Sequence, residues 1–368
     1  MNSTPRWDDV DLLRGAIIML MAIDHASLMV AHQHSSEFWG AALPVYDDAR
    51  WLLTRLITHV CAPGFFLLMG VGIANTQRPP RYFLLRGALL ILLQQVIENP
   101  AWLLASISGD AGSYLHRGGA VPGGGSPVLV HLGVLYGLGA SLMLWGLLKN
   151  LPAWSIALVI AGMLACSSLT IASADPARLY GPSMRLLLVP GHSDWLQVYY
   201  PLMPWAAVSG VGLLTGRALR VAPQATRRAL PWIGVLLLLT FVLLRAADSG
   251  DAHALGDGWR AWLALTKYPP GLAYLSLTTG SLLLAWSAIA ALPSLVATPA
   301  RVFGRSALFF YLLHLYLYAA LGLLFPHGGG LALVYTSWLG GLLLLYPACR
   351  WYGAFKRNKP SDSLWRLF

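Results

Sequence analysis

Charge is scarce in this chain. Only 11% of its 368 residues are charged and 57% are hydrophobic, whereas a soluble domain usually carries about 25% charged residues. This composition excludes an ordinary water-soluble globular protein. Apolar runs near or above the roughly 20 residues that cross a bilayer recur along the chain. The sequence therefore predicts an all-α, polytopic membrane protein, organised as a single integral membrane domain over residues 1–368.

Cysteine is equally rare. Cys61, Cys166 and Cys349 are isolated and show no CxxC spacing, which excludes a disulfide framework and a thiolate metal site. The segment His32-Gln33-His34 followed by Glu37 has the spacing of half a zinc site, but no second cluster completes four ligands. We therefore expect no metal and interpret these residues as acid/base groups near the outer mouth of a site.

The apolar runs predict about ten membrane-spanning helices. Their expected positions are about 10–31, 52–75, 82–106, 128–148, 153–173, 198–219, 230–247, 269–291, 303–325 and 331–349. The first run contains Asp24 and His25 and follows three aspartates, so it lacks the features of a cleaved signal peptide. We expect it to remain in the protein as the first span.

The net charge of +10 is distributed unevenly between the loops. The basic loops carry Arg78, Arg81 and Arg86; Lys149; Arg217, Arg220, Arg227 and Arg228; Arg301 and Arg305; and, in the tail, Lys356, Arg357 and Lys359. The opposite loops carry Glu37, Asp47, Asp48, Glu98, Asp110, Asp175, Asp194, Asp248, Asp251 and Asp257. By the positive-inside rule the basic side is cytoplasmic, which places both termini in the cytoplasm. The charge is thus explained by membrane topology, and we expect no nucleic-acid partner.

Ionisable side chains enter the first span. A charge in hydrocarbon costs at least about 2.5 to 3.5 kcal/mol, so each one needs a partner or a task. Arg14 and His25 are eleven positions apart, which on a helix places them on one face with a rise of about 16 Å. A cation at the cytoplasmic end and an acid/base group deep in the bilayer suit a long, phosphate-bearing substrate such as a coenzyme A thioester. The competing interpretation pairs Arg14 with Asp11 at the membrane surface and gives His25 only a backbone hydrogen bond.

Three further residues are candidates for the same cavity. His59 stands beside Cys61-Ala62-Pro63-Gly64, where the proline is expected to bend the second span. His314 falls near the middle of the ninth span, and Lys267, followed by Tyr268, precedes the eighth span at its outer end. Each of these could instead be structural: a membrane histidine can bridge two helices, and a lysine can extend to the interface.

Two Gly-x-x-x-Gly pairs, Gly133/Gly137 and Gly212/Gly216, indicate close helix packing. That packing could lie within the chain or between protomers. A homodimer is therefore one possible assembly.

Short sequence blocks, taken in order, resemble the heparan-α-glucosaminide N-acetyltransferase-like family of bacterial membrane proteins. The blocks are Asp11-Leu12-Leu13-Arg14-Gly15 with Ala22-Ile23-Asp24-His25; Thr54-Arg55-Leu56-Ile57-Thr58-His59-Val60-Cys61-Ala62-Pro63; Tyr200-Pro201-Leu202-Met203-Pro204-Trp205; Thr266-Lys267-Tyr268-Pro269-Pro270; Phe303-Gly304-Arg305 with Phe309-Phe310-Tyr311-Leu312-Leu313-His314; and Tyr346-Pro347-Ala348-Cys349-Arg350-Trp351. The resemblance covers essentially the whole chain.

The resemblance implies a multi-pass acyltransferase of the bacterial cytoplasmic (inner) membrane. Such an enzyme takes acetyl from cytosolic acetyl-CoA, its acetyl donor, and delivers it to an amino sugar or related glycan on the other side. The family's active histidine would align at Ser35, beside His34, while Asp24 matches a polar residue that ends the family's first span. The base is therefore either His25 or His34, and we favour His25 because it lies deeper and shares a face with Arg14. The Leu-Arg-Gly block is also similar to membrane O-acyltransferases that modify polysaccharides.

These considerations give one set of expected site residues. The set comprises His25, Asp24, His34 and His59 for catalysis, Arg14, Arg86, Arg305 and His314 for the coenzyme, and Lys267 and Tyr268 for the acceptor. In the acetyltransferase, His25 is a base or carries acetyl briefly. The competing function is a proton-coupled transporter of a sugar-like or anionic solute, in which Asp24 and His25 relay protons. A membrane scaffold would explain neither residue.

Overall fold

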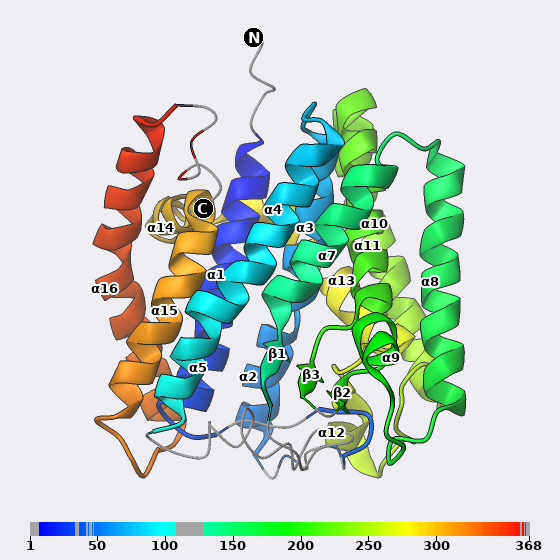
Figure 1. Ribbon diagram of the computed structural model, residues 1–368, viewed down its shortest axis with the longest axis horizontal. Coiled ribbons are helices and arrows are strands. Elements are labelled where there is room, and N and C mark those ends of the chain that lie inside the picture. The colour runs from blue at the N-terminus through cyan, green and yellow to red at the C-terminus, as the bar shows by residue number, and fades with distance from the viewer. Residues whose placement is uncertain are drawn as a thin grey trace. The chain divides into compact units, whose positions relative to one another are not determined.

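The computed structural model describes residues 7–33, 37–41, 43, 46, 48–107, 128–193, 195–360, 363 and 365. The chain is mostly helical (Figure 1). Among the described residues, seven helices are long and apolar enough to cross a membrane, and an eighth qualifies if one bent pair is counted as a span. The seven are Asp8–Met29, Ala49–Ala74, Pro80–Ala105, Ala153–Ser173, Pro223–Ala246, Leu272–Ala291 and Leu331–Arg357. The prediction of a polytopic helical protein is confirmed, while ten spans with both ends inside stays a prediction.

The contacts divide the chain into two compact units, each assembled from separate segments. Unit 1 comprises Met1–His34, Ile97–Gly112 and Ala288–Phe368. Unit 2 comprises Ser35–Val96 and Ser113–Ser287. The chain passes between the two units more than once, so neither unit is a contiguous piece of the sequence.

Unit 1 is a group of packed helices. Its elements are α1 (Asp8–Met29), α5 (Asn99–Ala105), η3 (Ile289–Ala291), α14 (Ser294–Arg305), α15 (Ala307–Gly322) and α16 (Leu331–Arg357). In Figure 1, α1, α15 and α16 run side by side, as their mutual contacts also show. Three aspartates in the first turn of α1 and two basic residues in the last turn of α16 match the helix dipoles. Both long helices therefore have favourable charges at one end.

Glycine lets α1 and α14 touch backbone to backbone. A Cβ atom at Gly15 would overlap the carbonyl of Ala300, and one at Gly304 would overlap the carbonyl of Asp11. Both glycines belong to the sequence blocks quoted above, so their small size has a packing reason. The contact holds the N-terminal half of α1 directly against α14.

The ninth expected span differs most from its prediction. The sequence predicts one helix over 303–325, but α14 and α15 meet at a bend of 97° at Ser306. Arg301 and Arg305 make the end of α14 amphipathic, which suits a helix at a membrane surface better than one inside it. The remaining helix, α15, has 16 residues.

Unit 2 contains the other long helices. They are α2 (Ala49–His59), α3 (Cys61–Ala74), α4 (Pro80–Leu93), α7 (Val134–Leu148), α8 (Ala153–Ser173), α10 (Leu202–Val221), α11 (Pro223–Ala246) and α13 (Leu272–Ala288). Two short helices, α9 (Pro182–Leu187) and α12 (Gly258–Leu263), complete it, and the π-helical turn η1 (Gln94–Glu98) joins α4 to α5.

Helices α3 and α10 form the most extensive helix contact of unit 2. A Cβ atom at Gly212 would overlap the carbonyl of Leu67, and one at Gly216 would lie 2.7 Å from Cβ of Ala74. The Gly212/Gly216 pair therefore packs two helices within the chain. In the other pair, Gly133 is the N-cap of α7 and only Gly137 lies within the helix, where a Cβ atom would lie 2.9 Å from side-chain atoms of both Phe66 and Tyr200.

A small sheet precedes two of these helices and was not predicted. Strands β1 (Val130–Leu132), β2 (Gly191–Ser193) and β3 (Leu196–Val198) form it in the order β1-β3-β2. The fourth expected span, 128–148, therefore begins as a strand, and α7 starts only at Val134 after the non-helical Gly133.

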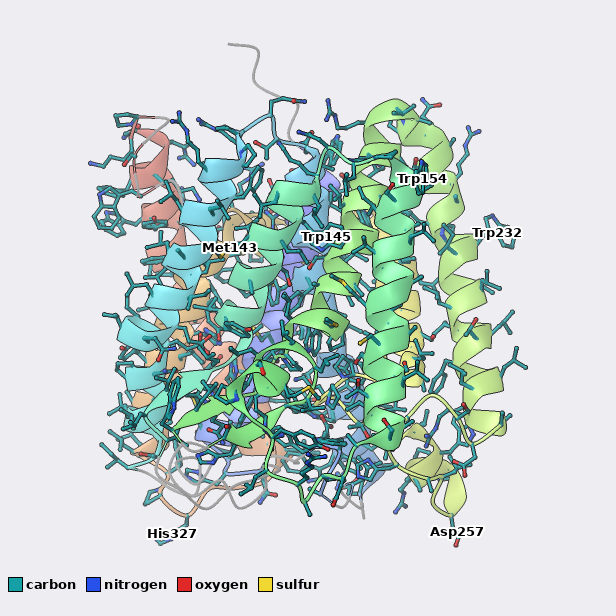
Figure 2. The ribbon with its side chains drawn as sticks, turned by 45° about the vertical axis from the view of Figure 1, so that its right-hand side comes forward. Met143, Trp145, Trp154, Trp232, Asp257 and His327 are labelled. Carbon is teal, nitrogen blue, oxygen red and sulfur yellow. The ribbon has the colours of Figure 1, made fainter. Side chains whose placement is uncertain are left out.

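The outward-facing helices expose apolar side chains. Leu158 on α8 and Leu236 on α11 are each 63% exposed, and Trp154 and Trp232 lie on the outer faces of the same two helices (Figure 2). An apolar helix surface of this extent is covered by lipid rather than water. The structure thus supports the membrane assignment independently of helix length.

Candidate functional site

The central feature of unit 1 is a pair of histidines on α1 and α15. His25 Nδ1 and His314 Nε2 are 2.6 Å apart, although 289 positions separate the residues in the sequence. His314 is fully buried, at 0% exposure. Its other ring nitrogen, Nδ1, lies 3.0 Å from the carbonyl oxygen of Phe310 one turn earlier. The sequence placed both histidines deep in the membrane, and the structure brings them into direct contact.

One arrangement of hydrogens satisfies this chain of nitrogens when both imidazoles are neutral. The Phe310 carbonyl can only accept, so His314 Nδ1 donates to it. His314 Nε2 then holds a lone pair and accepts from Nδ1 of His25. This leaves Nε2 of His25 with a lone pair. That nitrogen can take a proton or attack an electrophilic carbon.

A carboxylic acid and an indole complete the surroundings of the pair. Trp102 meets the His25 ring edge to face at 5.6 Å between centroids. The Trp102 Nε1 group donates to Glu98 Oε1 at 3.4 Å, and Tyr311 also hydrogen-bonds the Glu98 side chain. Glu98 ends the π-helical turn η1, where Pro100 cannot donate to the preceding turn. Such π-helical turns are frequent at functional sites.

The interpretation of Glu98 as an outer-loop acid is wrong. The charge pattern counted it among the acids of the outer loops, but it lies inside the helical stretch Pro80–Ala105 and is 2% exposed. Its position within the predicted span 82–106 was the available signal. Its contact with Trp102 depends on the π-helical turn, which no hydrophobic pattern reveals.

The other end of α1 carries a network of ion pairs. Arg14 Nη1 lies 3.0 Å from Asp11 Oδ1 and 3.4 Å from the carbonyl oxygen of Gly304. Arg305 Nε lies 3.7 Å from Asp11 Oδ2, and Arg305 Nη2 lies 3.4 Å from Asp8 Oδ1. Arg301 Nε lies 2.9 Å from Asp8 Oδ2. The pairing of Arg14 with Asp11 that the sequence offered as a structural interpretation is therefore present. Two of the expected coenzyme residues, Arg14 and Arg305, both pair with Asp11 at this end of unit 1.

Arg14 and His25 both face the α14–α15 pair. Arg14 contacts Gly304 at the end of α14, and His25 contacts His314 on α15. Because α1 is a continuous helix between them, the eleven-residue spacing gives a rise of about 16 Å along one face. Asp24 precedes His25 on this helix and is partly buried. Arg86 lies in unit 2, on α4, where its Nη1 donates to the hydroxyl of Tyr82 at 2.8 Å.

A second buried group of ionisable residues lies in unit 2. Glu37 Oε2 accepts from Arg55 Nη2 at 2.6 Å, and Glu37 Oε1 accepts from Arg55 Nε and from His59 Nε2, each at 2.8 Å. All three side chains are buried. Burial alone would raise the pKa of Glu37, but the charge and hydrogen bonds of Arg55 and His59 outweigh it and hold that pKa well below its ordinary range. Glu37 is therefore an ionised carboxylate with both oxygens in use.

Proline chemistry explains where His59 sits. Helix α2 ends at His59 and α3 begins at Cys61, and Pro63 has no N–H to donate to the His59 carbonyl four residues earlier. The hydroxyl of Tyr274 donates to that carbonyl instead, at 3.0 Å. The expected break at Pro63 thus ties α2 to α13 and fixes the His59 backbone.

Lys267 and Tyr268 lie directly against Glu37. The backbone N–H groups of both residues donate to the Glu37 carbonyl at 3.1 Å, and Trp39 N–H donates to the Tyr268 carbonyl at 3.0 Å. The Tyr268 ring stacks on Phe38 with centroids 4.8 Å apart. Two further aromatic rings, those of Tyr199 and Tyr200, lie at 5.6 and 5.4 Å from it. Unit 2 therefore combines Lys267, Tyr268 and His59 around Glu37, which the sequence offered as an acid/base group near the outer mouth, and Arg55, which the sequence did not select for a site.

Two expectations concern the segment between α1 and α2. His34, the alternative base, lies outside the described residues, as does Ser35. His32 is described, and its Nε2 lies 3.0 Å from the carbonyl oxygen of Phe325. Over the part of the chain that the structure describes, no group of three or more His, Cys, Asp or Glu side chains is placed to hold a metal ion.

Comparison with known proteins identifies the family. No curated protein matches the chain. The family model for the catalytic region of heparan-alpha-glucosaminide N-acetyltransferase matches residues 6–242, which is more than half of the 368 residues. The match includes Arg14, His25 and His59, and it ends before Lys267 and His314. The chain therefore belongs to the heparan-alpha-glucosaminide N-acetyltransferase catalytic-domain family.

Proposed function

We propose that this protein transfers acetyl from cytosolic acetyl-CoA to an amino sugar or related glycan acceptor on the outer side of the bacterial cytoplasmic membrane. Family membership supports a membrane acetyltransferase. The observation that carries the proposal is the hydrogen bond between His25 and His314, because it orients the partly buried His25 imidazole with a lone pair on Nε2. General acid/base and acyl-transfer chemistry both need such a nitrogen.

The mechanism assigns a task to each histidine. His25 Nε2 removes the proton as the acceptor nitrogen or oxygen attacks the thioester carbonyl, and the resulting imidazolium protonates the departing coenzyme thiolate. In the covalent variant, His25 Nε2 itself attacks the carbonyl and the carbon–sulfur bond breaks, so that the thiolate leaves. The acceptor then attacks the acetyl group, the bond from its carbon to His25 Nε2 breaks, and the proton released by the acceptor neutralises the coenzyme thiolate. In both variants His314 Nε2 accepts from His25 Nδ1 and stabilises the positive charge that develops on His25. His314 is thus proposed as a positioning residue.

Acetyl transfer in purified protein tests the proposal. Radiolabelled acetyl-CoA and glucosamine are incubated with the protein in detergent, and acetylated sugar and free thiol are measured together. Equal amounts of both products are expected. Thiol release without acetylated sugar, or binding of neither acetyl-CoA nor coenzyme A in a thermal-shift assay, would contradict it.

The proposed membrane topology has ten spans with both termini in the cytoplasm, because the basic loops alternate with the acidic ones. Gln224 in the first turn of α11 and Asp257, the N-cap of α12 in the segment that follows α11, are exposed and are suited to test it. With the exposed Cys166 replaced by serine, Asp257→Cys should react with an impermeant maleimide from outside intact cells. Gln224→Cys should react only after the cells are opened. The reverse pattern would invert the assignment.

Coenzyme binding at the basic end of unit 1 gives a second prediction. Arg14 and Arg305 meet there, and cationic side chains at this position suit the coenzyme phosphates. Arg14→Ala should weaken acetyl-CoA binding at low salt. The loss should shrink at high salt, where the contribution of Arg14 is already screened. Calorimetric titration at two salt concentrations measures both effects, and unchanged affinity at low salt would remove Arg14 from the site.

A further inference from the structure

Lys267 is a buried lysine held at a fixed place in unit 2. Its side chain is 6% exposed, and two backbone hydrogen bonds tie the Lys267-Tyr268 segment to the carbonyl of Glu37. Its Nζ atom lies 5.2 Å from the centre of the Tyr268 ring. A lysine that merely reached the membrane surface would be exposed at its tip.

The ammonium group of Lys267 has no counter-ion among the residues that the structure describes. Across the described part of the chain, its Nζ makes neither an ion pair nor a hydrogen bond, and it lies over the Tyr268 ring. The neighbouring carboxylate of Glu37 accepts from Arg55 and His59 instead. A buried charge without a partner is strongly unfavourable. An anionic group of a ligand would supply the counter-charge for the Lys267 ammonium group.

His59 presents a second unused group beside Lys267. Its Nε2 faces the ionised Glu37 and therefore carries the hydrogen, which leaves a lone pair on Nδ1. This Nδ1 atom is enclosed and has no hydrogen-bond partner among the described residues. Both residues are held at Glu37, because the Lys267 backbone N–H donates to the Glu37 carbonyl and His59 Nε2 donates to the Glu37 carboxylate. In its neutral form, His59 Nδ1 can only accept, and it would take a hydroxyl or amine hydrogen.

We propose that Lys267 and His59 form a subsite for an acidic sugar, in which Lys267 binds a carboxylate or phosphate and His59 Nδ1 accepts from a neighbouring hydroxyl or amine. The inference rests on the proposed function, since it gives the acceptor glycan an acidic group. Glu37 and Arg55 act through His59 as positioning residues. The phosphates of acetyl-CoA have the same anionic chemistry, so the experiment must separate the two sources.

Binding of defined sugars tests the subsite without any acetyl transfer. Glucosamine 6-phosphate, glucosaminuronate and glucosamine are titrated into the whole protein in detergent, and the thermal shift is followed. The two acidic sugars should stabilise the protein at concentrations at least about tenfold lower than glucosamine. Lys267→Gln should abolish this preference and Lys267→Arg should retain part of it. Lys359→Gln is the matched control, because Lys359 also lies over an aromatic ring, 4.4 Å from the centre of Phe355, and should keep the preference.

The stability of the ligand-free variant adds a readout that separates binding from structure. If Lys267 has no counter-ion, Lys267→Gln should melt at the wild-type temperature or above it. A lower melting temperature would show that Lys267 is a structural partner and would overturn the proposal. Equal binding of acidic and neutral sugars by the wild type, or an unchanged preference in Lys267→Gln, would also overturn it.

Kinetics then separate the two anionic ligands. In Lys267→Gln, the KM for acidic amino sugars should rise about tenfold or more, with little change in kcat or in the KM for glucosamine. A loss of acetyl-CoA affinity with unchanged sugar binding would assign Lys267 to the coenzyme and overturn the acidic-acceptor subsite. Sugar binding that depends on Lys267, combined with no acetyl transfer to any sugar, would leave the subsite standing and refute the proposed function.

Discussion

His25→Ala should abolish acetyl transfer while leaving acetyl-CoA binding and the folded state intact. The structure gives His25 a hydrogen-bonded partner, His314, that leaves Nε2 as the reactive nitrogen. General base or nucleophilic catalysis by such a group contributes on the order of 10²-fold or more, and alanine removes all of it. The measurement is the rate of acetyl transfer, alongside the melting temperature and the dissociation constant for acetyl-CoA.

Three other histidine variants show whether His25 itself is the catalytic histidine. His314→Ala should lower the rate less than His25→Ala, and it should shift the pH profile of kcat because the remaining imidazole loses its oriented partner. His327→Ala is the matched control, since His327 lies in the same unit and is exposed, and it should stay active. Near-normal activity in His25→Ala together with loss in His34→Ala would move the active site to the segment between α1 and α2.

Hydrophobic pattern predicted where helices lie better than where they break. Residues 153–173 were predicted as a span and form α8 from Ala153 to Ser173. In contrast, the bend at Ser306 divides an apolar run whose composition does not change. The strand Val130–Leu132 depends on pairing with Leu196–Val198. Such features depend on contacts between distant segments, which no local periodicity encodes.

In the candidate site, too, the sequence indicated individual residues but not their contacts with distant segments. His25 and His314 were selected because an ionisable group in an apolar span needs a partner, but the sequence did not show that each is the other's partner. Glu37 was interpreted as an outer-loop acid because it lies outside every apolar run, and Arg55 was quoted only as part of a sequence block. Their burial together depends on the pairing of Glu37 with the Lys267-Tyr268 segment more than 200 positions away. Chemistry therefore identified candidate residues, while tertiary structure determined their partners.

The largest stability effect is expected at Glu37. Glu37→Gln removes the negative charge that pairs with Arg55 and His59 and so breaks a buried ion pair. Breaking a buried ion pair in this way costs about 3–5 kcal/mol. The matched control is Asp48→Asn, because Asp48 also pairs with an arginine, Arg50, but at an exposed position. Salt screens an exposed pair, so this control should leave the melting temperature nearly unchanged.

The pH dependence of the melting temperature tests whether the stability lost in Glu37→Gln is due to the charge of Glu37. Burial raises the pKa of Glu37, but Arg55 and His59 together lower it by more than burial raises it. The pKa in the folded protein therefore lies well below the value of about 4.3 expected for an unfolded glutamate. A lowered pKa contributes stability above the unfolded value and loses it as the pH falls. The difference in melting temperature between wild type and Glu37→Gln should therefore be constant from neutral pH down to about 5 and shrink below about 4. A difference that persists unchanged at the lowest pH would mean that the shape of the glutamate side chain, and not its charge, holds Arg55 and His59 in place.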